Sequence, residues 1–292
     1  MKFAFINAHR YCFPIVRMCC VLDVSENGYY HWRKRGICQR KRDDEQLAER
    51  IEDAFQKNRG VYGSPRLHSE LKDQGVRCGR KRIVRLMQAL HICASRKRKK
   101  AQKTDSKHND PFAPNLLKQN FTADAPNKKW MTDMTFIETQ EGWLYLAGVI
   151  DAYSRKIVGW AMGQNHDAEL VKRALQMALI QRQPGAGLVH HSDRGSEYAS
   201  KSYQKMLQEH GIQVSMSKKG DCYDNAPIES FWGTLKEECL GRNTYHTRKE
   251  AKNAVFDYIE TFYNRKRKHS SLGYISPDCY ENQKKEEEWK NT

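Results

Sequence analysis

The feature that most constrains the fold lies in the middle of the chain, where three short segments rich in β-branched and aromatic residues follow one another closely. They are residues 130–138, 143–150 and 156–162, and the second (WLYLAGVI) is an almost continuous apolar run, as in a buried strand. The turns around Gly142 and over 151–155 are short, so the three segments predict an antiparallel meander. A chain with this meander must form a sheet and must bury its apolar residues under other elements.

Beyond the meander the pattern changes to alternating helices and strands. Asp167 can cap a helix that runs to about residue 181, because its carboxylate can accept hydrogen bonds from the unpaired N–H groups of a first turn. The elements expected after it are a strand at 188–192, a helix at 199–210, a strand at 212–216 and helices at about 225–240 and 247–264. This order predicts an α/β fold with a mixed five-stranded sheet and flanking helices.

The front of the chain differs from the rear in charge. Positions 1–110 hold 26 basic and 12 acidic residues, whereas positions 111–292 hold 25 and 23. A positive surplus confined to one half attracts polyanions. We therefore expect the front half to engage a polyanion such as nucleic acid, and the balanced rear half to have acidic residues available for other tasks.

Small helical elements are predicted before the sheet. Residues 1–40 contain two short helices, one after Pro14 and one after Ser25, which form either a helix-turn-helix or an ordinary packing pair. Residues 41–94 contain three more helices, and the third begins with a basic run. This helix is a candidate recognition helix on DNA, and the alternative is a small bundle with a solvated basic face. The basic residues concerned are Arg80, Lys81, Arg82 and Arg85.

Several classes of protein are disfavoured by composition. Residues 95–107 (SRKRKKAQKTDSK) are too poor in apolar side chains to fold, and they predict a basic linker that either follows a phosphate backbone or stays solvated. The chain has no run of about 18 apolar residues and no secretory signal at its start, so we expect a cytoplasmic protein with no membrane partner. The nine cysteines form no CxxC pair, which favours reduced thiols over a zinc site or a disulfide framework.

Three carboxylates occupy positions that suit a catalytic site. Asp133 lies in the middle of the first strand, where an acid is costly unless it is paired or binds a cation. Asp193 follows the strand at 188–192, at the end where open α/β sheets usually place their sites. Glu229 lies beside the apolar stripe of its helix, with Lys236 two turns further along the same edge.

Oxygen ligands of this kind suit a hard divalent cation, Mg²⁺ with Mn²⁺ as a possible substitute. Two such ions can activate a water and stabilise the leaving oxygen of a phosphodiester, so His190 and His191 are expected to orient or pack neighbouring groups and not to act as the base. Any single acid has an alternative role as a helix cap or a salt-bridge partner. The spacing of the three acids favours a shared catalytic role over these alternatives: 59 residues separate Asp133 from Asp193, and 35 separate Asp193 from Glu229.

This spacing, and several segments around it, resemble the downstream-frame (OrfB-type) transposases of bacterial insertion sequences, whose catalytic core is related to retroviral integrases. The matching segments cover nearly the whole chain: W-x-x-D-x-T at Trp130, GWLYLAGVIDAYSRKIVGW, HSDRGSEY, GDCYDNAPIE and FYNRKRKHSSLGYISP. The resemblance implies a ribonuclease-H-like core in which Asp133, Asp193 and Glu229 hold Mg²⁺. It also implies that Lys236 contacts DNA near the transposon end.

The activity implied by the resemblance is cleavage at an insertion-sequence end followed by strand transfer into target DNA, two displacements at phosphorus. Asn225 also belongs to the family pattern as a DNA-binding residue, although a turn or helix-capping role is an equal alternative. Retroviral integrases carry a zinc-bound His/Cys module that this chain lacks, which suggests that the basic front half engages DNA instead. The rival functions are a nuclease of the same fold that only hydrolyses, and a non-catalytic DNA-binding protein.

The resemblance also implies partners and a division into domains. The expected partners are the terminal repeats and target DNA, further copies of this chain on the DNA, and an upstream-frame product that could be joined to this chain by a frameshift; the expected location is the bacterial nucleoid. The predicted domains are an N-terminal helical segment (1–40), a helix-turn-helix-like DNA-binding domain (41–94), a basic linker (95–120), an integrase-type core (121–284) and a charged tail (285–292).

Overall fold

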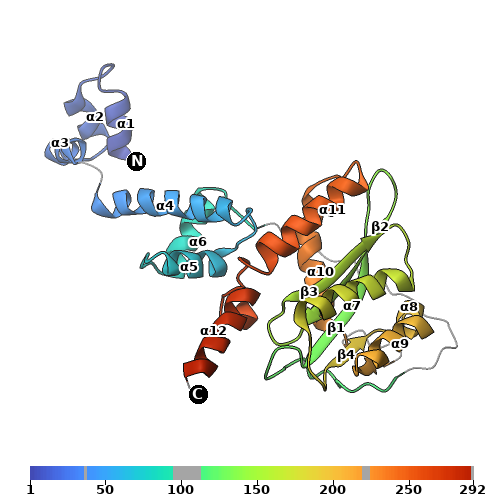
Figure 1. Cartoon of the computed structure of the whole chain (residues 1–292). Coiled ribbons are helices and arrows are strands. Elements are labelled where there is room, and N and C mark those ends of the chain that lie inside the picture. Colours follow the sequence, from blue (N-terminus) through green and yellow to red (C-terminus); the bar gives the residue numbers. More distant parts are fainter. Residues whose placement is uncertain (36–37, 95–112, 219–223, 291–292) are drawn as a thin grey trace. The chain divides into compact units, whose positions relative to one another are not determined.

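The computed structural model describes residues 1–35, 38–94, 113–218 and 224–290. The chain divides into two compact units, Met1–Cys93 and Ala94–Thr292, which are considered separately (Figure 1). The predicted basic segment 95–107 lies outside the described residues. Among the described residues no helix is both long and apolar enough to span a bilayer.

The first unit begins with three short helices, α1 (Lys2–Ala8), α2 (Ile15–Val21) and α3 (Glu26–Lys34). They share a small core of Ile6, Met18, Cys19 and Tyr29. The two helices expected after Pro14 and Ser25 are confirmed, and the Ser25 Oγ caps α3 by accepting a hydrogen bond of 3.0 Å from the backbone N–H of Gly28. Helix α1 was not predicted.

The same unit continues with α4 (Gln39–Lys57), α5 (Ser64–Asp73) and α6 (Arg80–Ala89), the three helices expected from the apolar pattern. Pro65 stands in the first turn of α5, where a missing N–H costs nothing. Each helix turns one apolar stripe inward, and the buried side chains include Leu47, Ile51, Leu67, Leu71, Ile83 and Leu86.

The second unit contains the predicted mixed five-stranded sheet. Its strands are β1 (Lys129–Ile137), β2 (Leu144–Asp151), β3 (Ile157–Gly163), β4 (Val189–Ser192) and β5 (Gln213–Met216). Their order is β3-β2-β1-β4-β5, with β1, β2 and β3 antiparallel and with β4 parallel to both β1 and β5. The meander and the two later strands are therefore confirmed.

The pairing of β1 creates an open edge. Strand β2 pairs with β1 over its whole length from Trp130 to Ile137, but β4 pairs only with Lys129, Trp130 and Met131. Beyond Met131, β1 has a strand partner on one side only in the described sheet. The opposite side stays accessible to helices and ligands.

Helices cover both faces of this sheet (Figure 1). Helix α7 (Ala168–Arg182), capped by Asp167 as predicted, packs with α8 (Ser196–Ala199) and α9 (Lys201–Glu209) on one face. Helix α10 (Ala226–Glu238) packs against β1 and β2, where Trp232 approaches Gly148. The helix expected at 199–210 is confirmed as α9, which begins after Ser200, whose side chain caps it; α8 was not predicted.

The chain after α10 consists of further helical elements. It contains a 3₁₀ turn (Leu240–Arg242), α11 (Arg248–Phe256) continued by π-helical turns (Asp257–Tyr263), a second 3₁₀ turn (Ser270–Leu272) and α12 (Pro277–Lys290). The expected helix at 247–264 is thus present but changes its hydrogen bonding partway, a feature common where helices serve a site or a strained contact. Helix α12 was not predicted and runs through position 284, so the boundary placed there stays a prediction.

Candidate active site

The structure places the three predicted carboxylates around the open edge of β1. Asp133 lies on β1 two residues beyond the last pairing with β4, Asp193 follows directly after β4, and Glu229 stands in the first turn of α10. The charges of Asp193 and Glu229 both act on Asp133. Among the described residues, no three His, Cys, Asp or Glu side chains lie close enough together to form a ready-made metal shell.

Asp133 is held in a fixed orientation by two N–H donors. The backbone N–H of Met134 donates to its Oδ1 at 2.8 Å, and the indole Nε1 of Trp232 donates to its Oδ2 at 3.0 Å. Trp232 can come this close because Gly148, the residue paired with Asp133 on β2, has no side chain; a Cβ there would lie 2.7 Å from the indole ring. A glycine inside an otherwise apolar strand is the signal that could have revealed this contact.

The carboxyl group of Asp133 is energetically strained in its charged form. Burial, followed by the nearby charge of Asp193, raises its pKa well above the ordinary range, and Glu229 adds to the effect. The hydrogen bonds from Met134 and Trp232 act in the opposite direction but do not compensate. A cation between the acids would relieve this repulsion, so the donor set, made of oxygen atoms only, fits a hard divalent ion.

A buried tyrosine lies next to the same acids and was missed by the sequence analysis. The hydroxyl of Tyr198, on α8, has no hydrogen-bond partner among the described residues, and its side chain is fully buried. Burial raises the pKa of Tyr198 well above its ordinary value, and the charges of Asp133 and Asp193 raise it further. This hydroxyl therefore remains a neutral donor beside two carboxylates.

The two histidines before Asp193 form part of the packing and not of the acidic cluster. His191 bonds to Ser215 Oγ through Nδ1 at 2.8 Å and to Ser217 Oγ through Nε2 at 3.2 Å, and His190 Nε2 lies 3.1 Å from the hydroxyl of Tyr203. Burial lowers the pKa of His190 to about 3 and that of His191 to about 4, so both are neutral at pH 7. They link β4 to β5 and α9, as the sequence analysis expected.

Asn225 is the N-cap residue of α10, but its side chain makes no capping hydrogen bond. Instead its amide Nδ2 donates to the backbone carbonyl of Thr132 at 2.9 Å, which ties the start of α10 to β1 beside Asp133. The side chain is only 5% exposed, and its Oδ1 has no partner among the described residues. The geometry favours a positioning role, and a direct DNA contact stays a prediction.

Lys236 lies two turns beyond Glu229 on α10 and is exposed at the open edge. Its Nζ lies 4.9 Å from the ring centroid of Phe136 on β1. Desolvation lowers the pKa of Lys236, while the charge of Asp133 acts to raise it. A cation is thus placed beside the acidic cluster, and its contact with DNA stays a prediction.

The basic residues of α6 divide into two groups. Arg82 Nε and Arg85 Nη2 each lie 2.7 Å from a carboxylate oxygen of Asp44 on α4, and these contacts lower the pKa of that carboxyl. Arg80 and Lys81 are exposed at the start of the helix, and Arg80 Nε makes only a long contact of 3.5 Å to Ser64 Oγ. Arg80 and Lys81 are therefore the better placed of the four predicted residues for a phosphate.

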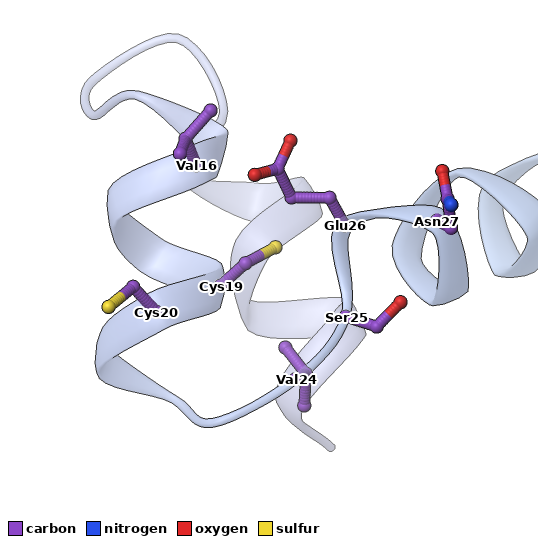
Figure 2. A pocket seen from close by; sticks show the side chains of 7 residues that line it. All are labelled: Val16, Cys19, Cys20, Val24, Ser25, Glu26 and Asn27. Atoms are coloured by element: carbon purple, nitrogen blue, oxygen red, sulfur yellow. The ribbon is translucent and has the colours of Figure 1, made fainter.

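The first unit contains a hollow of its own. Figure 2 shows it between the end of α2 and the start of α3, with the Cys19 and Cys20 thiols, Ser25 and the Glu26 carboxylate around it. Burial raises the pKa of Cys19, which keeps that thiol protonated. The cysteines in the described ranges are free thiols. Nothing in this hollow joins the predicted catalytic set.

Comparison with known proteins agrees with this architecture. Residues 123–222 and 210–277 match models of the integrase core domain, and residues 41–100 match an HTH-like domain. The chain is 49% identical over 263 residues to "Insertion element IS600 uncharacterized 31 kDa protein" of Shigella sonnei, covering 90% of this chain and 97% of that protein. It is 41% identical over 284 residues to "Transposase InsF for insertion sequence IS3A" of Escherichia coli strain K12, covering 97% and 99% of the two chains.

Among solved structures, a simian T-cell lymphotropic virus intasome in complex with a PP2A regulatory subunit is 16% identical and has a TM-score of 0.47, covering 75% of this chain and 74% of that one. An integrase core preceded by an HTH-like domain defines an enzyme of the DDE transposase and integrase class. More particularly, the chain belongs to the IS3 family of insertion-sequence transposases.

Proposed function

We propose that this transposase cuts the phosphodiester at the ends of its insertion sequence and joins the freed 3′-hydroxyl to target DNA, with Asp133, Asp193 and Glu229 as the catalytic carboxylates. The observation that carries the proposal is the crowding of Asp133 by Asp193 at the open edge of β1, which disfavours two negative charges unless a cation lies between them. Both reactions displace an oxygen at phosphorus, so one set of ligands can serve both.

The three carboxylates would hold Mg²⁺, with Mn²⁺ as a substitute. When bound, the divalent ion supplies Lewis acidity at the reacting phosphodiester. The chain's own residues prepare the site: Met134 and Trp232 fix the two oxygens of Asp133, and the backbone N–H of Gly195 donates to Asp193 Oδ1 at 2.9 Å. Orientation by fixed donors reduces the reorganisation needed when substrate binds.

We assign DNA binding to residues of both units. In the core, Lys236 would hold a phosphate near the scissile bond, and Asn225 would keep α10 in place on β1. In the first unit, Arg80 and Lys81 would contact the DNA backbone, while Arg82 and Arg85 would shape the helix through Asp44. Further copies of the chain, an upstream-frame product and the bacterial nucleoid remain the partners and location that we propose.

The experiment that tests this function uses a labelled duplex with the terminal sequence that borders the reading frame, incubated with the full chain and Mg²⁺. We expect both a cleaved end and a joined product. Asp133→Asn, Asp193→Asn and Glu229→Gln should each bind the duplex but give less than a few per cent of wild-type product, because each keeps the side-chain shape and removes a charge that binds metal. Strand transfer above a few per cent of wild type by any of the three would contradict the assignment.

The rival functions give different products in the same assay. A nuclease that only hydrolyses would yield the cleaved end without any joined strand. A DNA-binding protein without activity would yield neither product, with or without Mg²⁺.

A further inference from the structure

Two large aromatic side chains are exposed on the hairpin formed by β1 and β2, and one of them lies beside Lys236. Phe136, near the end of β1, is 44% exposed, and Trp143, just before β2, is 47% exposed. Their rings meet edge to face, with centroids 5.1 Å apart and an interplanar angle of 84°. Single exposed apolar residues are ordinary, but two rings held in contact at the surface form a preorganised apolar platform.

The hairpin that carries these rings is firmly held. Within the turn, Thr139 Oγ1 donates to the carbonyl of Gly142 at 2.6 Å. The start of α11 adds further bonds: the backbone N–H of Arg248 donates to Glu141 at 2.8 Å, and its guanidinium Nε donates to the carbonyl of Trp143 at 3.1 Å. The rings are therefore fixed in place, which lowers the entropic cost of binding a flat partner.

The surroundings of the platform indicate what it binds. Lys236 Nζ lies 4.9 Å from the centre of the Phe136 ring, and Arg248 contacts the main chain of Trp143, so two cations border the rings. Phe136 is three residues from Asp133 along β1, about 10 Å at the usual rise of a strand, and this odd separation starts the two side chains on opposite faces of the sheet. Lys236 connects them at the open edge, because the charge of Asp133 acts on its ammonium group, which also lies over the Phe136 ring. At about 3.4 Å per nucleotide, a separation of about 10 Å is within three nucleotides of a phosphate held at Asp133.

We propose that Phe136 and Trp143 form a stacking platform for an unpaired nucleobase within about three nucleotides of the scissile phosphate, while Lys236 holds the neighbouring phosphate. Flat aromatic faces accept any base by stacking, and adjacent cations fix the charged backbone. The open edge of β1 leaves room for a strand with its bases turned out of the duplex. This inference rests on the proposed function, because it takes the acidic cluster as the place where the phosphate reacts.

The test is a double-mutant cycle between protein and DNA. Fluorescence anisotropy measures binding of the terminal duplex to the full chain in Ca²⁺, with each of the last nucleotides replaced in turn by an abasic site. Stacking on an aromatic side chain is worth enough to change affinity by about tenfold. We expect Trp143→Ala and one abasic position each to weaken binding by about tenfold, and the two together to weaken it no further.

Matched variants separate stacking from a structural effect. Trp143→Phe should restore most of the affinity, because an aromatic face is retained. Trp289→Ala, which removes an exposed tryptophan of the same unit, should bind like the wild type. Replacing the base at the sensitive position by 5-iodouracil and irradiating should crosslink it to the peptide that contains Phe136 or Trp143.

Three results would overturn the inference. The losses of affinity caused by the abasic site and by Trp143→Ala could multiply at every position, or Trp143→Ala could bind DNA as tightly as Trp289→Ala. In the third, sedimentation without DNA would show a changed oligomeric state for Trp143→Ala. The last would make the platform an interface between copies. Because binding is measured without cleavage, the two proposals fail separately. Coupling without cleavage in Mg²⁺ would reject the proposed chemistry alone, whereas cleavage without coupling would reject the platform alone.

Discussion

At the scale of single residues, the site depends on one missing side chain. Gly148 pairs with Asp133 across β1 and β2, and the space above it is filled by the indole of Trp232 that donates to Asp133. The three acids could be proposed from the sequence, because their spacing and their places in a strand, after a strand and on a helix can be read along the chain. The glycine inside β2 indicates a close approach of some group, but the partner Trp232 could not be identified, because the contact joins distant positions and depends on how α10 lies on the sheet.

The first prediction follows from that close contact. Gly148→Ala should place a methyl group 2.7 Å from the indole, displace Trp232 and remove the indole donor from Asp133, which keeps only the backbone N–H of Met134. Overpacking of this kind costs about 1–3 kcal/mol, and we expect a lower melting temperature together with a loss of cleavage of more than about tenfold. Gly185→Ala is the control, since nothing lies within 4 Å of the added atom. Equal cleavage by the two variants would mean that the indole does not support the acid.

At the scale of elements, the strands were predictable and the end of the chain was not. Apolar runs predict buried strands, as in β2 and β3. Helix α12, in contrast, is a highly charged segment with no clear apolar face. Its start is held by long-range contacts that no local pattern reveals. Glu281 accepts hydrogen bonds from Ser154 Oγ at 2.6 Å and from Arg182 at 2.7 and 2.9 Å, which joins α12 to α7 and to the turn after β2.

The second prediction concerns this junction. Burial alone would raise the pKa of Glu281, but the hydrogen bonds from Arg182 and Ser154 outweigh it and hold the pKa below the ordinary value. A lowered carboxyl pKa gives stability that is present above the unfolded pKa of about 4.3 and is lost as pH falls below it. Glu281→Gln should therefore lower the free energy of unfolding by about 3 kcal/mol at pH 7, and the deficit should shrink towards lower pH.

Thermal or urea unfolding of the two proteins at several pH values measures this difference. The exposed Glu209→Gln serves as control and should change stability by less than about 0.5 kcal/mol. A deficit for Glu281→Gln that stayed constant down to pH 3 would show that the charge of Glu281 is not what stabilises the junction.

At the scale of the whole molecule, the division of charge along the sequence corresponds to a division into structural units. The unit Met1–Cys93 carries the basic helix α6, and the unit with the sheet carries the acids. Charge and apolar periodicity were enough to predict a basic helical region followed by a sheet, while the exact domain bounds stay a prediction. The pairing of Arg82 and Arg85 with Asp44 was not predictable, because side chains on α4 and α6 meet only after the helices pack.

The third prediction uses that difference among the basic residues. In the full chain, the double variant Arg80→Ala with Lys81→Ala should weaken DNA binding and reduce the slope of log affinity against log salt by about 2, because each lost phosphate contact releases about 0.9 fewer counterions. The double variant Lys201→Ala with Lys205→Ala removes the same charge from α9. If both double variants changed the slope equally, the helical unit would have no special role on DNA.

The central claim is that the three carboxylates act as metal ligands during strand transfer, and a change of ligand chemistry tests it most directly. Asp193→Cys replaces a hard oxygen by a softer sulfur, which Mg²⁺ accepts poorly and Mn²⁺ accepts better. Strand transfer of the labelled terminal duplex should fall below a few per cent of wild type in Mg²⁺ and should recover in part in Mn²⁺. Undiminished strand transfer by Asp193→Cys in Mg²⁺ alone would contradict the account.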